Sequence, residues 1–122
     1  TGWETEQIGL GDLNWELVEE LGRKVNPHAN SGGFRKCNVT IAGSVPPVVF
    51  APWYEVPRLV GIWVESVAEG KMNANEAYIE LLGTIHPFAD GNGRTGKILF
   101  NWLNGTLSDP VLPKVPGEWR IP

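Results

Sequence analysis

The chain has 122 residues, 42% of them hydrophobic, which is enough for a single compact domain (1–122) with a substantial core. Its formal net charge of −4 argues against nucleic acid as the main partner, because binding a phosphate backbone over a broad face needs a basic surplus. Cys37 is the one cysteine, so a disulfide framework within the chain is excluded.

Residues 12–25 are predicted to form the first helix. Apolar residues recur four apart along this segment, and Asp12 stands where an N-cap is expected. The segment 26–34, which contains proline and glycines, then breaks the pattern.

Residues 35–50 differ, because β-branched residues alternate roughly with others before the sequence GSVPP. This pattern predicts a short hairpin, which Pro46 and Pro47 confine to a sheet edge. An isolated hairpin is marginally stable, so we expect it to lie on a helical body as a mobile flap.

Three further helices are expected. The segment 53–70 is apolar on nearly every side, which predicts a central, buried helix with Pro57 in its first turn. Residues 73–85 open with a capping-box spacing of Asn73 and Glu76. The last helix is indicated by apolar residues that end near Gly105: Ile98, Leu99, Trp102 and Leu103.

The C-terminal tail, 108–122, is rich in proline and is expected to lie extended over the surface, where Trp119 would pin it. Together, these expected elements make a mostly α-helical domain that carries one hairpin.

The sequence GNGRTGK, 91–97, matches three phosphate-binding patterns, but its context disfavours them. A P-loop needs Ser or Thr after the lysine, whereas Ile98 follows Lys97. P-loops and dinucleotide loops also follow a strand of a parallel sheet, and here a helical pattern comes first. The kinase glycine loop joins two strands, and the other kinase motifs are absent.

The remaining interpretation is a helix, the sequence HPFAD, a glycine turn and a second helix. Pro87 disfavours the α conformation at His86, so the first helix should stop there, and Phe88 becomes a natural plug into the core. Gly91 and Gly93 permit backbone angles in which successive N–H groups form an anion nest.

Asn92 is expected to cap the helix that follows, whose positive dipole end faces the same space. Arg94 and Lys97 share one face of that helix, and cations in a first turn are unfavourable unless an anion lies between them. We therefore predict an anion site. The alternative is a capped helix with solvated cations.

His86 and Asp90 add chemistry to this turn. The imidazole pKa near neutrality suits a general base. Asp90 is the single acid between His86 and Lys97, and one carboxylate together with substrate phosphates is a usual way to hold Mg²⁺.

The sequence HPFADGNGRTGK resembles the Fic-domain signature, His-Pro-Phe-x-Asp/Glu-Gly-Asn-Gly-Arg-x-x-Arg, at every position but the last. The resemblance extends more loosely over about 33–105, where Gly33-Phe34-Arg35 precedes the expected flap. It implies a Fic-type helical core with a short β-hairpin flap.

The resemblance also implies protein adenylylation, the transfer of AMP from ATP to a protein hydroxyl. His86 would then be the base, Asp90 the ligand of Mg²⁺ or Mn²⁺, and Asn92 a contact to the α-phosphate. Gly91 and Gly93 would supply the anion hole, and Arg94 would hold the β-phosphate. The hairpin at 37–50 would dock the target protein by strand addition; a plain surface flap is the alternative.

Lys97 departs from the signature, which ends in a second arginine. The lysine ammonium is a point charge, whereas the arginine guanidinium is a planar fork of donors. We therefore expect that recognition of the triphosphate is altered and that the transfer reaction is retained. Doc-like kinases resemble this family but typically carry Ala and Lys at the glycine positions, so Gly91 and Gly93 favour AMP transfer. The alternatives are a Doc-like kinase, a transferase that uses another nucleotide, and a non-catalytic scaffold that binds nucleotide or protein.

Many family members carry an inhibitory Ser/Thr-x-x-x-Glu motif, and this chain has none. We therefore expect that any restraint comes from a separate inhibitor protein, such as an antitoxin, and a toxin role follows by analogy alone. The segment TGWETEQ is no signal peptide and no apolar run reaches spanning length. We expect no membrane or nucleic-acid partner, and a location in the cytoplasm or in a host cell after delivery.

Overall fold

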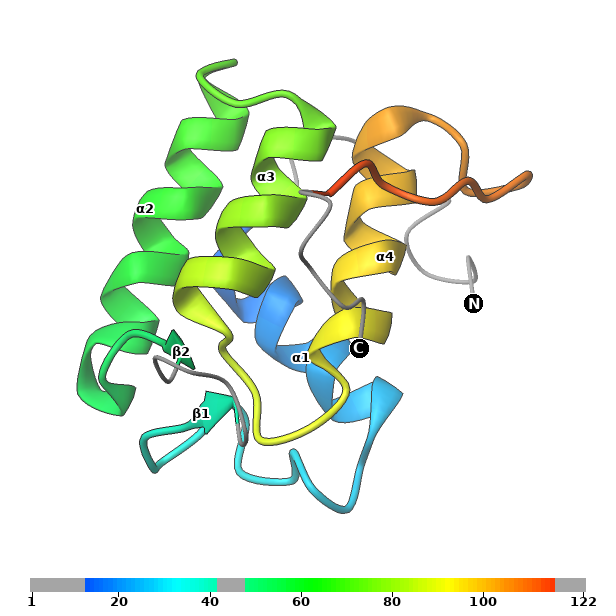
Figure 1. Ribbon diagram of the computed structural model, residues 1–122. Coiled ribbons are helices and arrows are strands. Elements are labelled where there is room, and N and C mark those ends of the chain that lie inside the picture. Colours follow the sequence, from blue (N-terminus) through cyan, green and yellow to red (C-terminus); the bar gives the residue numbers. More distant parts are fainter. Residues whose placement is uncertain (1–12, 42–47, 116–122) are drawn as a thin grey trace.

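The computed structural model describes residues 13–41 and 48–115, which are mostly helical, as predicted. Helices α2 and α3 stand side by side with α4, while α1 packs against α2 and α4 (Figure 1). The two short strands gather at the end of the bundle where α4 begins (Figure 1). The elements in chain order are α1 (Trp15–Val25), β1 (Thr40–Ile41), β2 (Val48–Val49), the 3₁₀ turn η3 (Trp53–Glu55), α2 (Val56–Ala68), α3 (Ala74–Glu80), the π-helical turn η4 (Leu81–Ile85) and α4 (Asn92–Asn104).

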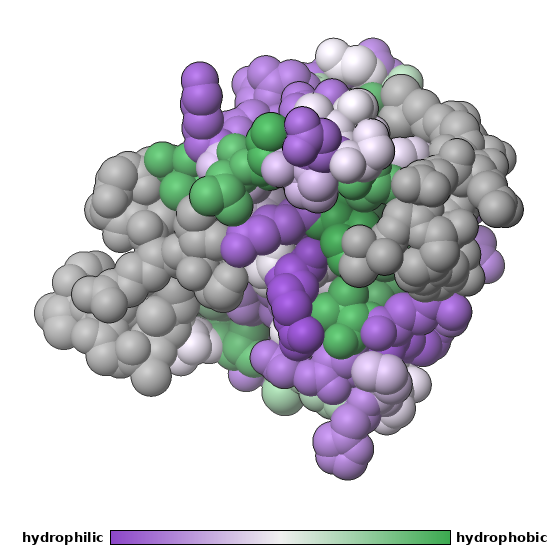
Figure 2. All heavy atoms as spheres, turned by 90° about the vertical axis from the view of Figure 1, so that its right-hand side faces the viewer, coloured by the Kyte–Doolittle hydropathy of each residue, from purple (hydrophilic) through white to green (hydrophobic). Residues whose placement is uncertain are grey.

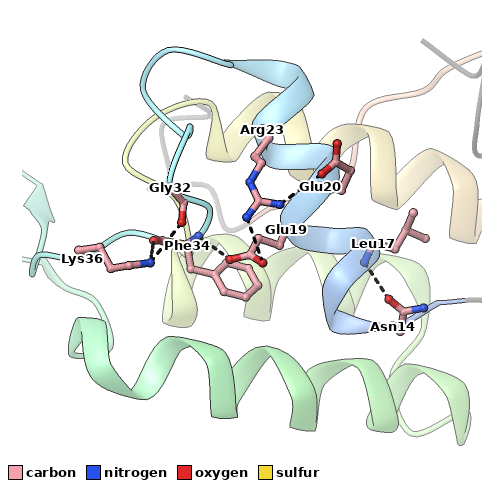
Figure 3. A network of polar contacts seen from close by, with 8 residues as sticks. All are labelled: Asn14, Leu17, Glu19, Glu20, Arg23, Gly32, Phe34 and Lys36. Carbon is pink, nitrogen blue, oxygen red and sulfur yellow. Dashed lines mark hydrogen bonds and ion pairs between the residues drawn. The ribbon is translucent and has the colours of Figure 1, made fainter.

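Helix α1 begins later than the sequence predicts. Asn14 is its N-cap: the backbone there is extended, and Oδ1 accepts a hydrogen bond of 2.8 Å from the N–H of Leu17 (Figure 3). The predicted start at 12 with Asp12 as the cap is therefore wrong, and Asp12 itself lies outside the described residues. Leu13 precedes the helix but is still buried in the core.

Helix α2 is buried on one face and exposed on the other. Pro57 lies in the first turn, as predicted. Ile62, however, is 47% exposed, so the expectation of a central helix buried on all sides is wrong. The reason is visible in Figure 1, where α2 stands at the edge of the bundle. The buried face is formed by Val56, Val60, Trp63, Val64 and Val67.

Helix α3 starts with the predicted capping box. The Asn73 side chain accepts from the N–H of Glu76 at 2.8 Å, and the Glu76 carboxylate accepts from the N–H of Asn73 at 3.0 Å. The helix continues directly into η4, where the N–H of His86 donates to the carbonyl of Leu81 at 2.8 Å, five residues back. The predicted apolar face is buried: Ala77, Leu81, Leu82 and Ile85.

The segment 37–50 contains a short antiparallel ladder, in which Thr40 pairs with Val49 and Ile41 with Val48. The connection between these strands, 42–47, lies outside the described residues, so the predicted flap stays a prediction.

The described part of the tail, up to Val115, has no regular structure and is tied to two helices. The N–H of Val111 donates to Asn101 at 2.8 Å, and the N–H of Lys114 donates to Asn75 at 2.7 Å. Asn101 belongs to α4 and Asn75 to α3. Trp119 lies outside the described residues.

Phe88 is the residue by which the loop between η4 and α4 enters the core, as predicted. Its side chain is 1% exposed, and its ring centroid lies 5.5 Å from that of Phe34. A Cβ atom at Gly22 would lie 2.2 Å from the Phe88 ring. The absence of a side chain on this glycine of α1 therefore makes the room into which Phe88 fits.

The face at the right of Figure 1 is shown in Figure 2, where hydrophilic side chains predominate among the coloured residues. Smaller hydrophobic areas lie between them. In the described ranges, no helix combines the length and the apolar character that a membrane span requires.

Replacing Gly22 with Ala should destabilise the fold, because the new methyl group would overlap the buried ring of Phe88. Overpacking of this kind costs about 1–3 kcal/mol. The matched control is Gly61→Ala in α2, where nothing lies within 4 Å of the added carbon. This control should be neutral or gain up to about 1 kcal/mol from helix propensity. Urea unfolding checks both, and equal effects of the two substitutions would contradict the packing role of Gly22.

Candidate active site

The predicted site residues lie on one continuous turn, from the end of η4 at His86 to the second turn of α4 at Lys97. The turn is held against the irregular segment that follows α1. Its two ends carry opposite partial charges, because η4 ends in free carbonyls and α4 begins with free N–H groups.

His86 has a left-handed backbone, with φ 49° and ψ 65°. Among the described residues it is the single non-glycine residue with a positive φ. The sequence predicts that Pro87 excludes the α conformation here, and this is confirmed. Such backbone strain is concentrated at functional sites in proteins, which supports a role for His86.

The imidazole of His86 is fixed at two points. Nδ1 lies 2.9 Å from the carbonyl oxygen of Leu82, and the ring stacks on Phe50 with centroids 3.9 Å apart and planes 12° apart. A carbonyl oxygen can only accept, so Nδ1 must carry the proton of the neutral ring. Nε2 then holds a free lone pair and is the atom that can accept a proton.

Burial is the largest cause that lowers the pKa of His86 below its ordinary value of 6.5. The hydrogen bond to the Leu82 carbonyl raises the pKa, and the positive charge of Arg35 lowers it. The net shift is downward, so the ring is neutral at pH 7, which is the form a general base needs.

Asp90 is exposed, and two asparagines that sequence reasoning missed hold it. Its Oδ2 accepts from Asn26 Nδ2 at 2.6 Å. Asn30, which is 1% exposed, donates to the Asp90 carbonyl at 2.9 Å and accepts from the Asp90 N–H at 3.3 Å. The sequence signal for them is the pair of asparagines four residues apart in NPHAN.

The described residues contain no group of three or more His, Cys, Asp or Glu side chains placed to hold a metal ion. The donor set at Asp90 is a single exposed carboxylate, with one oxygen oriented by Asn26. This set fits Mg²⁺, which is commonly bound by one or two carboxylates together with substrate phosphates.

Asn92 does not cap α4, contrary to the sequence prediction. The N-cap is Gly91, and Asn92 is the first residue of the helix. The Asn92 amide instead turns back to the loop: Oδ1 accepts from the Phe88 N–H at 2.9 Å, and Nδ2 donates to the Phe88 carbonyl at 2.8 Å. The side chain therefore fixes the core plug, and its contact to phosphate stays a prediction.

Gly91 and Gly93 differ in backbone conformation, and the anion nest predicted from both stays a prediction. Gly91 is left-handed, with φ 73°, and a Cβ there would lie 2.9 Å from Val25. Gly93 has no positive φ and lies within α4. The N–H of Thr95 donates to the Gly91 carbonyl at 2.9 Å. The N–H groups of residues 92–94 precede this first helical bond, and free N–H groups at a helix N-terminus are suited to bind an anion.

The first turn of α4 contains no acidic residue. Arg94 is exposed, and Lys97 is half-buried one turn later. Both cations lie near the positive end of a helix of 13 residues. Repulsion between these charges and the helix dipole is relieved when an anion is bound.

Comparisons with known proteins show the family of this chain. A family model described as the Fic/DOC family matches residues 8–104, which confirms the resemblance carried by the motif. No solved structure gave a significant match.

Three relatives are similar to this chain. A probable protein adenylyltransferase of Aquifex aeolicus is 36% identical over 85 residues, which is 62% of this chain and 25% of that protein. The protein adenylyltransferase Fic of Drosophila grimshawi is 31% identical, over 84% of this chain and 23% of its own length. The protein adenylyltransferase Fic of Culex quinquefasciatus is 33% identical, over 69% of this chain and 18% of its own length. The chain thus spans a quarter or less of these relatives.

The downward pKa shift of His86 should be visible in an NMR titration. The imidazole of His86 is expected to titrate with a midpoint below 6.5, because burial penalises the charged ring. Its protonation should therefore oppose folding, so the stability that the neutral ring contributes is present above pH 6.5 and lost as pH falls through the lower folded-state pKa. His86→Asn assigns the signal, and a midpoint at or above 6.5 would contradict the burial argument.

Proposed function

Because this chain belongs to the Fic/DOC family, we propose that it is a protein adenylyltransferase, which moves AMP from ATP to a hydroxyl side chain of a target protein. The observation that carries the proposal is the geometry of His86. Its Nδ1–H is held by the Leu82 carbonyl, which leaves Nε2 as the ring nitrogen that can accept a proton. The three relatives above are named as protein adenylyltransferases, which supports the same reaction class.

In the proposed step, the target hydroxyl oxygen forms a bond to the α-phosphorus of ATP. The bond from that phosphorus to the oxygen bridging the β-phosphate breaks, and pyrophosphate leaves. Nε2 of His86 accepts the hydroxyl proton. General bases of this kind contribute about 10²–10⁴-fold to a rate.

The phosphates would lie at the start of α4. The N–H groups of residues 92–94 would stabilise the charge on the α-phosphate, and Arg94 would bind the β-phosphate. Lys97 would supply a point charge further along the helix. Asp90 would hold Mg²⁺ or Mn²⁺, which supplies neutralisation of the phosphate charge when bound.

The target protein is proposed to dock on the 37–50 segment by strand addition, and a separate inhibitor protein is proposed as the means of control. Two other functions are distinguished by the experiment below: a Doc-like kinase or a transferase for another nucleotide, and a non-catalytic scaffold.

The test uses the purified chain with a cell lysate and ATP labelled at either the α- or the γ-phosphate. Label on protein from the α-phosphate is expected. Label from the γ-phosphate would instead mean a kinase, and no label with any nucleotide would mean a binding scaffold.

His86→Ala should lower the transfer rate by about 10²–10⁴-fold, because it removes the base. Nucleotide affinity should change little, since the imidazole acts on the hydroxyl and not on the phosphates. His28→Ala is the matched control, because His28 is exposed and lies outside the motif loop. Calorimetry and the α-label assay measure the two quantities, and full transfer by His86→Ala would remove His86 from the mechanism.

Asp90→Ala should weaken nucleotide binding in the presence of Mg²⁺ and have less effect without it, because the carboxylate would act through the metal. Asp109→Ala is the control, an exposed carboxylate in the segment after α4. Calorimetry with and without Mg²⁺ measures the difference. A wild-type affinity that does not depend on divalent metal would overturn the assignment.

A further inference from the structure

Arg35 is a buried cation whose described hydrogen-bond partners are all backbone carbonyls. The residue is 3% exposed, and its Nε donates to the His86 carbonyl at 2.6 Å. One terminal nitrogen donates to the Cys37 carbonyl at 2.9 Å. The other donates to the carbonyls of Ile85, at 3.0 Å, and Ala51. The Arg35 N–H also donates to the Pro87 carbonyl at 2.9 Å.

These bonds join three segments that lie far apart in the sequence. Ile85, His86 and Pro87 form the end of η4 and the start of the motif loop. Cys37 and Ala51 flank the strand pair on its two sides, so the guanidinium ties both ends of the 37–50 segment to η4. A buried charge is costly unless it is well bonded, and the fixed fork of five N–H donors of arginine suits several carbonyls at once.

Two of the Arg35 hydrogen bonds, to the carbonyls of His86 and Ala51, constrain His86. The bond to its carbonyl holds the left-handed backbone from which the side chain departs. The bond to Ala51 fixes the residue next to Phe50, and the Phe50 ring stacks on the imidazole. The N–H of Ala51 also donates to the Thr84 carbonyl at 3.0 Å, which holds the same strand exit against η4.

We propose that Arg35 is a positioning residue for proton transfer: through the His86 carbonyl and the Phe50–Ala51 strand exit it sets the orientation of the His86 imidazole. The inference rests on the proposed function of His86 as the base. Arg35 acts through the backbone and through Phe50, and its guanidinium makes four hydrogen bonds to backbone carbonyls.

Electrostatics supports the same arrangement. The positive charge of Arg35 lowers the pKa of His86, as a smaller cause beside burial. Burial in turn lowers the pKa of Arg35 itself, although the guanidinium remains charged at neutral pH.

The experiment compares Arg35→Lys, which keeps the cation but loses the fork, with Arg35→Gln, which loses both. Arg58→Gln is the matched control, because Arg58 pairs with Glu55 on the exposed face of α2. The kcat and the KM for ATP are measured with the α-label assay, the folded fraction by urea unfolding, and the His86 imidazole by NMR titration. His28 provides a reference signal in the same spectra.

In folded protein, both Arg35 variants should lower kcat by about 10- to 100-fold, because a displacement of about 1 Å is enough for such a loss. The KM for ATP should change by less than about 2-fold, since the phosphate site on α4 is not touched. The His86 midpoint should rise in Arg35→Gln, which removes a cation, and rise less in Arg35→Lys.

Three results would overturn the proposal. One is an unchanged kcat in folded variants. Another is a loss of activity that merely follows the unfolded fraction. The third is that neither variant folds, which would show that Arg35 serves the fold as a whole.

The titration keeps this inference separate from the proposed function. If the wild-type chain transfers no AMP, the adenylylation proposal fails while the His86 signal still reports on Arg35. Identical His86 chemical shifts and midpoints in wild type and Arg35→Gln would then remove Arg35 as a positioning residue.

Discussion

The left-handed backbone of His86 is the conformation on which the geometry of the site depends. A non-glycine residue in this region costs about 1–2 kcal/mol, so the surroundings must hold it there. The Leu81 carbonyl binds its N–H, Arg35 binds its carbonyl, and Pro87 excludes the α conformation. If α3 and η4 continued as a regular helix through this point, Phe88 would leave its place against Gly22.

The segment that follows α1 shapes the motif loop from outside. Asn30 bonds both backbone groups of Asp90 and also donates to the Gly22 carbonyl at 2.9 Å, so it joins the end of α1 to the loop. Each buried polar group left without a partner costs about 1–3 kcal/mol, so the loss of Asn30 would destabilise both the end of α1 and the loop. Glu19 in α1 accepts a hydrogen bond of 3.1 Å from the N–H of Phe34 and forms an ion pair with Arg23 (Figure 3). The bond to Phe34 fixes the backbone directly before Arg35 against α1.

The sequence predicts those features that depend on interactions between residues close together in the chain. The capping box of α3, the stop at His86 and the end of α4 at Gly105 depend mainly on residues within one or two turns. The core position of Phe88 is predicted from its place after Pro87, although the room for its ring comes from the distant Gly22. Asn30 lies 60 residues from Asp90, and His86 lies 51 residues from Arg35, so these contacts are beyond the reach of local sequence signals. The cap of α1 is local as well, because Asn14 accepts from the N–H of Leu17 three residues on, but Asp12 offers a competing cap residue two positions earlier. The exposed face of α2 depends on where the neighbouring helices stand, which the sequence does not show.

The candidate site lies between helix ends of opposite polarity, which would allow one short loop to hold both a base and an anion. The carbonyl end of η4 accepts the Nδ1–H of His86, so the proton is kept on that side of the ring and the base is Nε2. The N–H end of α4, with Arg94 and Lys97, attracts an anion although the whole chain carries a net charge of −4. Arg35 is the cation on the carbonyl side, where it offsets the partial negative charge of those carbonyls. The proposed base and the proposed anion site are thereby fixed relative to each other by the turn from His86 to Gly91 that joins the two elements.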